Sequence, residues 1–278
     1  MRATQAEKYK AFKTLHSNRD AFVIPNPWNA GTARILTSLG FQALATTSAG
    51  FAFSVGRRDS TAGLSRDEIL DNASEILKAT HLPVSADLED GFGEAPEACA
   101  ETIKLAAQAG LVGGSIEDAT GDANQPIFEL GLAVDRVSAA SEVAQRLPFL
   151  LTARAENFLY GRSDLNDTIA RLQAFAEAGA DVLYAPGLPS LDAIRAVCEA
   201  VDRPVNVVMG LQEPTFSVEE LQSAGVKRIS VGGALARAAL GAFVRAAKEV
   251  KNEGTFSFAA ETLADSEASG YMAATKRS

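Results

Sequence analysis

The amino-acid sequence predicts one α/β domain, a (β/α)8 TIM-type barrel in which eight parallel strands alternate with helices. Eight short apolar segments recur along the 278 residues, helical patterns lie between them, and glycine alternates with proline at the entry to successive strands. Eight strands that alternate with helices are typical of a closed barrel, and about 250 residues is a usual length for one. A doubly wound open sheet is the alternative fold.

The predicted strands are mostly rich in Val, Ile, Leu, Phe and Ala, and none alternates cleanly with polar residues. Continuous apolar runs of this length suit strands that are buried on both faces of a parallel sheet. They cover residues 21–25, 43–48, 83–87, 113–117, 149–154, 182–185, 205–209 and 228–231.

Glycine and proline mark where the predicted helices end and the strands begin. A glycine just after a helix adopts the left-handed conformation that ends it, and a proline stops a helix while occupying the first position of a strand. The glycines precede strands two, four, six and eight, and they are Gly40, Gly110, Gly179 and Gly225. The prolines precede strands three, five and seven, and they are Pro83, Pro148 and Pro204.

Residues 1–252 are predicted to form the barrel together with an N-terminal helix. Within it, Ser65 is placed to cap the helix whose apolar face runs through residues 69–77, and the last helical pattern runs from about Gly233 to Asn252. Residues 253–278 are more weakly patterned. They form either a frayed tail or a segment that docks on a neighbouring subunit.

Composition limits the kinds of partner. The chain has 26 basic and 35 acidic residues, for a net charge of −9, which argues against nucleic acid or an anionic membrane as the main partner. Residues 1–13 lack the apolar core of a signal peptide, and no apolar run approaches the ~20 residues that span a bilayer. The two cysteines, Cys99 and Cys198, do not suggest a disulfide framework, so we expect a cytoplasmic protein.

Acidic residues gather at the predicted carboxyl ends of adjacent strands, where barrels of this type build their active sites. Asp87 and Glu89 follow strand three, Glu117 ends strand four, and Asp59 lies in the loop after strand two. Crowded carboxylates repel one another unless a cation neutralises them, and Mg2+ prefers oxygen ligands. We therefore expect Asp87, Glu89 and Glu117 to form a Mg2+ site that Mn2+ could also fill. Solvated loop acids are the alternative interpretation.

Arg154, at the end of strand five, is the candidate for binding an anionic substrate. Its planar guanidinium matches a carboxylate or a phosphonate, although a structural ion pair with Glu156 or Glu117 is the alternative. Tyr184 and Asn206 could bind substrate or simply pack inside the barrel. Trp28 is a further candidate for substrate contact at the same end.

Five segments resemble the isocitrate lyase and phosphoenolpyruvate mutase superfamily, in order and at matching strand ends. They are Thr46–Gly50, Gly56–Ser60, Asp87–Gly93, Ser115–Asp118 and Ala153–Glu156. The resemblance covers nearly the whole barrel. It implies a barrel whose last helix is swapped between subunits, a homotetramer built as a dimer of dimers, and Mg2+ that holds an α-keto or α-hydroxy acid.

The resemblance also implies roles for individual residues. Asp87 would be the nearest metal ligand, and Asp59, Glu89 and Glu117 would hold metal-bound waters. Arg154 would bind the anionic end of the substrate. Its carboxylate would be bound by donors around three consecutive residues, Thr47, Ser48 and Ala49.

The chain also departs from the superfamily's motifs. Residues 119–131 contain none of the Lys, Cys and His residues of the Lys-Lys-Cys-Gly-His loop found in the tricarboxylate lyases, so a thiol acid is absent there. Asn124 is a candidate counterpart of the asparagine in the gating loop of the phosphonate enzymes. Glu89 replaces a commoner aspartate, and the extra methylene can move a bound water.

Together these features predict a Mg2+-dependent carbon–carbon lyase or decarboxylase. Its substrate would be a small α-keto or 2-substituted malate-like acid that passes through an enolate and releases pyruvate or a similar keto acid. One alternative is cleavage or rearrangement of a P–C bond, with phosphonate substrates and a requirement for Asn124. The other is a barrel that binds keto acids without turnover.

Overall fold

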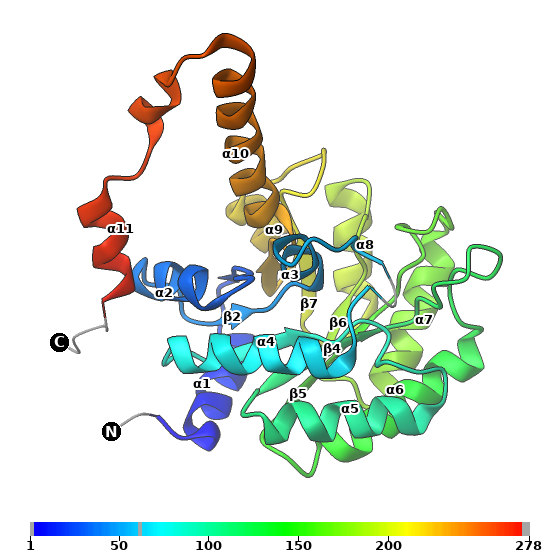
Figure 1. The fold of residues 1–278 in the computed structure, drawn as a ribbon. Helices are drawn as coiled ribbons and strands as arrows, with labels where there is room; N and C mark the ends of the chain where they lie inside the picture. The colour runs from blue at the N-terminus through cyan, green and yellow to red at the C-terminus, as the bar shows by residue number, and fades with distance from the viewer. Residues whose placement is uncertain (1–2, 61–62, 274–278) are drawn as a thin grey trace.

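The computed structural model describes residues 3–60 and 63–273, and its centre is a barrel of eight parallel strands (Figure 1). Hydrogen-bonded neighbours follow the order β1-β8-β7-β6-β5-β4-β3-β2. The ring is nearly closed, because Ala45 N–H on β2 donates to the carbonyl of Pro25, just after β1, at 3.1 Å. The strands are β1 Phe22–Ile24, β2 Leu44–Ala45, β3 Val84–Asp87, β4 Gly113–Glu117, β5 Leu150–Arg154, β6 Val182–Tyr184, β7 Val205–Val208 and β8 Arg228–Ser230.

The predicted barrel and its eight strands are confirmed, and the largest difference is the length of β2. The apolar run 43–48 yields a strand of two residues, because Thr47 caps a helix that begins at Ser48. The helices are α1 Gln5–Ser17, α2 Ala30–Ser38, α3 Ser48–Ser54, α4 Arg66–Ala79, α5 Pro96–Gln108, α6 Leu130–Ala144, α7 Leu165–Glu177, α8 Leu191–Ala200, α9 Val218–Ser223, α10 Ala234–Glu253 and α11 Asp265–Met272, with a 3-10 turn at Ser257–Glu261.

The predicted helix boundaries are also present. Ser65 caps α4, with its side chain accepting from Glu68 N–H. The four glycines placed before even-numbered strands all have positive φ, between 87° and 102°, and each directly follows the C-cap residue of α2, α5, α7 or α9. Only glycine adopts this conformation without strain, which is why the chain turns from helix to strand there.

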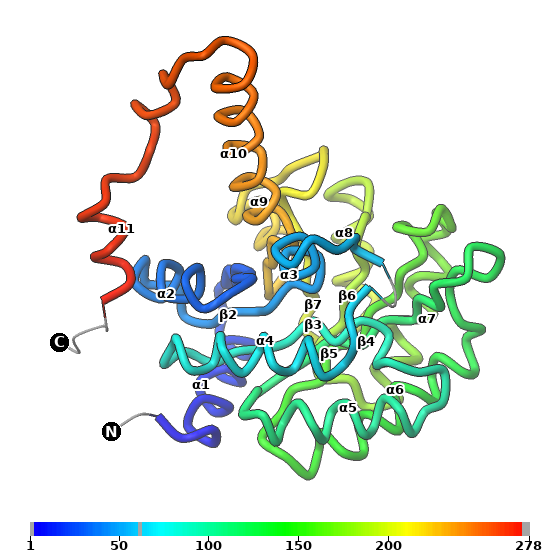
Figure 2. The backbone as a smooth tube through the Cα atoms, in the orientation of Figure 1, coloured from blue at the N-terminus to red at the C-terminus, as the bar shows by residue number. Residues whose placement is uncertain are grey.

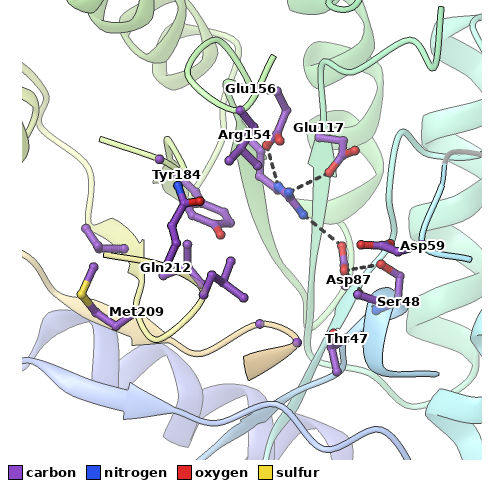
Figure 3. A pocket seen from close by; sticks show the side chains of 18 of the residues that line it. Thr47, Ser48, Asp59, Asp87, Glu117, Arg154, Glu156, Tyr184, Met209 and Gln212 are labelled. Carbon is purple, nitrogen blue, oxygen red and sulfur yellow. Dashed lines mark hydrogen bonds and ion pairs between the residues drawn. The ribbon is translucent and has the colours of Figure 1, made fainter. Parts of the chain in front are cut away.

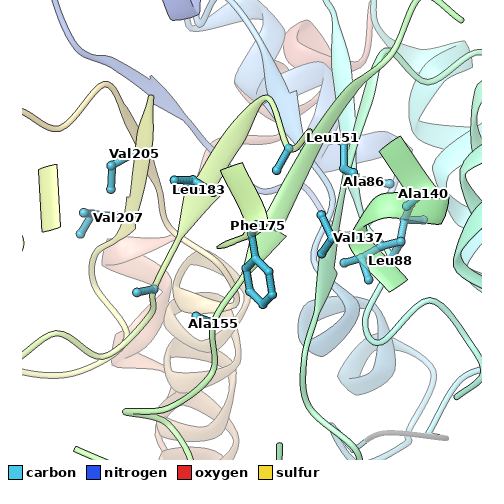
Figure 4. Packing of buried hydrophobic residues seen from close by; sticks show 14 of the residues in the cluster. Ala86, Leu88, Val137, Ala140, Leu151, Ala155, Phe175, Leu183, Val205 and Val207 are labelled. Atoms are coloured by element: carbon cyan, nitrogen blue, oxygen red, sulfur yellow. The ribbon is translucent and has the colours of Figure 1, made fainter. Parts of the chain in front are cut away.

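The main core lies between the strands and the surrounding helices. Val137 of α6 and Phe175 of α7 belong to the same buried cluster as Leu151 of β5 and Leu183 of β6 (Figure 4). A smaller cluster closes the amino-terminal end of the barrel, where Phe12 of α1 packs with residues of β1, β5 and the start of β4. The opposite end, at the carboxyl ends of the strands, carries a cavity of about 720 Å3.

Helix α10 projects away from the barrel, and the chain then returns so that α11 lies beside α2 (Figures 1 and 2). Arg34 Nη1 on α2 donates to the carbonyl of Met272 at 3.0 Å. In α10 only Ala236 is buried, while Leu240, Phe243 and Val244 are exposed. Within the described residues no helix, α10 included, is both long and apolar enough to cross a membrane.

Candidate active site

Three strand ends bring the predicted acids and Arg154 together (Figure 3). Asp87, Glu117 and Arg154 are the last residues of β3, β4 and β5, and Glu117 is directly paired with Arg154 in the parallel register. Parallel strands end at the same edge of a barrel, so their terminal side chains meet there. The strand pattern in the sequence therefore located this cluster correctly.

Arg154 lies at the centre of the cluster and pairs with three carboxylates. Its Nη1 lies 3.1 Å from Asp87 Oδ1, its Nη2 2.9 Å from Glu117 Oε2, and its Nε 2.9 Å from Glu156 Oε1. The guanidinium carbon stands 5.0 Å from the centre of the Tyr184 ring. Both ion pairs considered from sequence are thus present, and Asp87 is a third partner. Each terminal nitrogen still carries a second N–H that can donate to a ligand.

Asp87 connects this cluster to the start of α3. Its Oδ2 accepts hydrogen bonds from Ser48 Oγ at 2.8 Å and from Ser48 N–H at 3.2 Å. Its own N–H donates to Thr46 Oγ1 at 3.0 Å. The carboxylate is therefore held on both sides, by Ser48 and by Arg154, with a defined orientation toward the cavity.

Glu89 and Asp59 are the two acids of the cluster that form no ion pair with a described residue. Glu89 is 8% exposed, its Oε2 has no hydrogen-bond partner, and its backbone has a φ of 48°, which is strained for a residue with a side chain. Burial and the charge of Asp87 raise the pKa of Glu89 to about 8. The same two causes raise the pKa of Asp59.

The pKa of Glu117 is raised above its ordinary value despite its ion pair. Burial is the main cause of the raised pKa. The charge of Arg154 lowers the pKa by less than burial raises it, because one guanidinium is shared among three carboxylates. Five acids therefore surround a single arginine. They are Asp59, Asp87, Glu89, Glu117 and Glu156.

This surplus of buried carboxylate fits a divalent cation. Glu89 has an unpartnered buried oxygen, and three acids have raised pKa values. Both features are expected where no cation neutralises crowded carboxylates. No three acids of the described chain are close enough to one another to enclose a metal directly. Mg2+ retains several waters and needs few direct carboxylate ligands, so Asp87 with water-mediated neighbours is a suitable set.

The cavity over these acids has a volume of about 720 Å3. One wall carries the acids, Arg154 and the start of α3. Across the cavity from them lie Met209 and Gln212 (Figure 3). The lining also includes the apolar residues Leu159, Leu188 and Val208, so a ligand held at the acids can also contact apolar side chains.

Most of the residues expected from sequence line this cavity. The lining includes the predicted metal ligands and the predicted catalytic or substrate-binding residues Thr47, Ser48, Ala49, Asp59, Asp87, Glu89, Glu117, Arg154 and Tyr184. Three others lie elsewhere. Asn206 is buried below the cavity, Trp28 accepts a hydrogen bond from Asn72 through its carbonyl, and Asn124 is exposed and bonded to Asp122.

Sequence reasoning did not assign a role to Glu156, Gln212 or Arg237, which also line the cavity. Glu156 had a signal, since it lies two residues beyond Arg154. Its backbone N–H donates to Asp118 Oδ1 at 2.8 Å, and Asp118 in turn pairs with Arg171 at 3.1 Å. This buried pair fixes the turn after β5.

The two cysteines lie outside the lining of the cavity. Burial raises the pKa of Cys99 to about 11 and that of Cys198 to about 11, so both thiols stay protonated at neutral pH.

Comparison with known proteins agrees with this architecture. A candidate lyase or mutase from Burkholderia cenocepacia J2315 superposes with a TM-score of 0.94, at 57% identity over 97% of both chains. A candidate phosphonomutase from the same organism has a TM-score of 0.79 and 36% identity, covering 90% of this chain and all of that one (100%). The 2-methylisocitrate lyase of Escherichia coli is 31% identical over 227 residues, 78% of this chain and 75% of that protein.

The sequence profile of the phosphoenolpyruvate phosphomutase family matches residues 12–251, which span the barrel from α1 to α10. The chain therefore belongs to this family, within the isocitrate lyase and phosphoenolpyruvate mutase superfamily, and it is an enzyme of the lyase and mutase type.

Proposed function

We propose that this enzyme is a Mg2+-dependent carbon–carbon lyase or decarboxylase that acts on a small α-keto or 2-substituted malate-like acid. One observation carries the proposal: five carboxylates gather near Arg154, which pairs with only three of them, in a cavity that is also lined by apolar residues. Excess acid favours a divalent cation that can hold an oxyacid, and the apolar lining favours a substrate with an uncharged or alkyl portion.

In this proposal Asp87 holds Mg2+, which Mn2+ could replace, while Asp59, Glu89 and Glu117 hold its waters. When bound, the cation stabilises negative charge on an α-keto acid as it becomes an enolate. The residues of the chain orient the substrate. Ala49 N–H, in the first turn of α3, has no carbonyl of its own helix to bind and is suited to a substrate carboxylate.

Arg154 binds the anionic end of the substrate and keeps its charge. Burial alone would lower its pKa, but Glu117, Glu156 and Asp87 raise that pKa well above the ordinary value. The guanidinium therefore stays protonated while the reaction builds negative charge nearby, and Glu156 fixes the direction of its Nε. The leaving portion of the substrate lies along Leu188 and Val208.

The test is release of pyruvate from oxaloacetate, 2-alkylmalates, methylisocitrate and phosphonopyruvate, with Mg2+ and with excess EDTA. We expect EDTA-sensitive release from one carbon acid. Asp87→Ala and Glu117→Ala should abolish it with the circular dichroism spectrum unchanged, and Asp122→Ala, at an exposed loop position, serves as the matched control. Full turnover by the Asp87→Ala enzyme would show that the site is wrongly assigned.

P–C bond chemistry is the second candidate function. Two findings favour it, namely the family match to phosphoenolpyruvate phosphomutase and the 36% identity to a candidate phosphonomutase. A hydrolase of this kind would release pyruvate only from phosphonopyruvate, whereas a mutase would convert phosphonopyruvate to phosphoenolpyruvate and release none. Both predict that Asn124→Ala abolishes turnover. Because Asn124 is exposed and bonded to Asp122 in an outer turn, we expect Asn124→Ala to be active instead.

For the assembly, we propose that α10 packs on a second copy of the chain, as a swapped helix in a dimer of dimers. Its Phe243 is 69% exposed, and Leu240 and Val244 lie on either side of it along the helix. Phe243→Glu should yield smaller particles in light scattering, while Lys248→Glu on the same exposed helix should not. Equal masses for both variants would argue against the swap. We also propose that the enzyme is cytoplasmic.

A further inference from the structure

A second buried arginine lies inside the barrel, below the acids. Arg228, the first residue of β8, is 5% exposed, and each of its three nitrogens contacts one side chain. Nε donates to Asn206 Oδ1 at 2.8 Å, Nη2 donates to Thr152 Oγ1 at 3.1 Å, and Nη1 lies 3.5 Å from His16 Nε2. Arg228 forms no ion pair with any described residue.

The partners of Arg228 are all uncharged. Asn206 and Thr152 are neutral by chemistry. Burial, aided by Arg228, lowers the pKa of His16 to about 3, so the imidazole is neutral at physiological pH. Its Nδ1 lies 2.8 Å from the Phe12 carbonyl and must donate, which leaves Nε2 to accept from Arg228. A buried cation without a counter-ion is unfavourable, so its charge must be balanced from farther away.

A small polar chamber joins Arg228 to the active-site cluster. It has a volume of about 60 Å3, and its lining includes Arg228, Asn206, Tyr184, Arg154 and Asp87. Several serine and threonine hydroxyls complete its wall. A polar space of this size holds about two waters. The remaining N–H groups of Arg228 can donate to such water, and Asp87, the acid that shares this lining, belongs to the cluster above.

We propose that Arg228 is a positioning residue, a fixed positive charge under the active site that favours the anionic substrate there and opposes the metal ion. The inference rests on the proposed function, because it assumes that the acid cluster binds a cation together with an oxyacid. Six acidic and two arginine side chains line the cavity, so the substrate must approach a surface with excess acid. A further buried positive charge reduces that repulsion without occupying the cavity.

The charge has opposite effects on the two ligands, and this gives the proposal its signature. Removing the charge strengthens the binding of a divalent cation and weakens the binding of an oxyacid dianion. A residue needed only for packing would change both affinities in the same direction, or neither. The signs therefore separate an electrostatic role from a structural one.

The experiment measures the dissociation constants of Mn2+ and, in saturating Mg2+, of oxalate, by titration calorimetry. For Arg228→Met we expect Mn2+ to bind about threefold to tenfold tighter and oxalate to bind weaker by a similar factor. Arg228→Lys should stay near the wild type. Asn206→Asp keeps Arg228 but places a carboxylate against its Nε, so it should resemble Arg228→Met even if that variant folds poorly.

His16→Phe is the matched control, because it loses a contact with Arg228 but retains the positive charge and the aromatic packing against Phe12 and Phe22. It should lower Tm and leave both dissociation constants unchanged. Arg228→Met and Asn206→Asp that match His16→Phe in both constants would overturn the inference and leave the proposed function intact. Wild-type enzyme that binds neither Mn2+ nor oxalate would overturn the proposed function, and the inference with it.

Discussion

Two arginines are buried in the same barrel with opposite surroundings. Arg154, at the carboxyl end of β5, pairs with Asp87, Glu117 and Glu156. Arg228, at the start of β8, contacts only neutral groups. The pKa of Arg154 is raised well above its ordinary value, whereas burial lowers the pKa of Arg228 to about 10. The same side chain thus serves as a shared counter-ion at one level and as an unbalanced charge at the other.

Removing Arg154 should have the largest effect on both stability and activity. In Arg154→Met three carboxylates lose their partner, which should lower the free energy of unfolding by about 3–5 kcal/mol and lower kcat/KM by a factor on the order of 10^3. Arg154→Lys retains the charge but not the planar fork, so its activity should fall less and its stability should largely recover. Urea denaturation and steady-state kinetics measure both effects. Arg154→Met with wild-type stability would contradict the shared ion-pair arrangement.

Removing Arg228 should destabilise the protein much less. Arg228→Met leaves Asn206, Thr152 and His16 without a donor but also removes a buried charge that has no counter-ion. These effects oppose each other, so we expect a change of about 1 kcal/mol or less in the free energy of unfolding. The measurement is urea denaturation beside Arg154→Met. If Arg228→Met lowered the free energy of unfolding as much as Arg154→Met, the two arginines would contribute equally to stability.

The acids around Arg154 should make stability depend on pH. The pKa of Glu89 is raised to about 8, so below that pH the folded protein binds a proton that the unfolded chain releases at its lower, ordinary pKa. Without metal, the contribution of Glu89 to stability is therefore fully present below pH 4.5 and is lost as pH rises to about 8, by up to ~1.4 kcal/mol per pH unit. Thermal melts in EDTA should show this slope.

Glu89→Gln should flatten that slope, and so should Mg2+, because a bound cation favours the carboxylate. Glu75→Gln, on the exposed side of α4, is a control that should leave the slope unchanged. An identical slope for Glu89→Gln and wild type would place the raised pKa elsewhere in the cluster.

Tyr184 stands between the two arginines, and changing it should have the smallest effect. Its ring faces Arg154, and the residue lines both the cavity and the chamber that reaches Arg228. Tyr184→Phe retains the ring face and removes only the hydroxyl, so kcat/KM should fall less than about fivefold. A loss of a hundredfold or more would show that the hydroxyl, rather than the ring, contributes to the reaction. Steady-state kinetics on the accepted acid decides this.

The sequence was sufficient to predict the fold and the acidic end of the site. Continuous apolar runs identified all eight strands, seven of them with a glycine or proline before the run, and the rule that active sites form at strand ends then located Asp87, Glu117 and Arg154. These are local signals, because the strand that carries each residue also determines its direction. The short β2 was not predicted, since the apolar pattern continues through residues that Thr47 caps as a helix.

Residues whose importance comes from tertiary contacts were harder to recognise. Arg228 was counted only as the edge of an apolar run, and its isolation from carboxylates depends on which side chains β5 and β7 place opposite it. Asn206 was predicted to line the site but lies one layer below, where it accepts from Arg228. Asn124 was proposed from a loop motif, and loop geometry cannot be read from spacing alone.

The placement of the two cysteines affects how the enzyme should respond to reagents that modify thiols. Both thiols are buried or half-buried, stay protonated, and lie away from the cavity. Alkylating reagents attack thiolates, and neither cysteine lines the cavity, so the candidate site offers them no thiol. Turnover should persist after treatment with iodoacetamide, under conditions where a relative that depends on a loop thiol would be silenced.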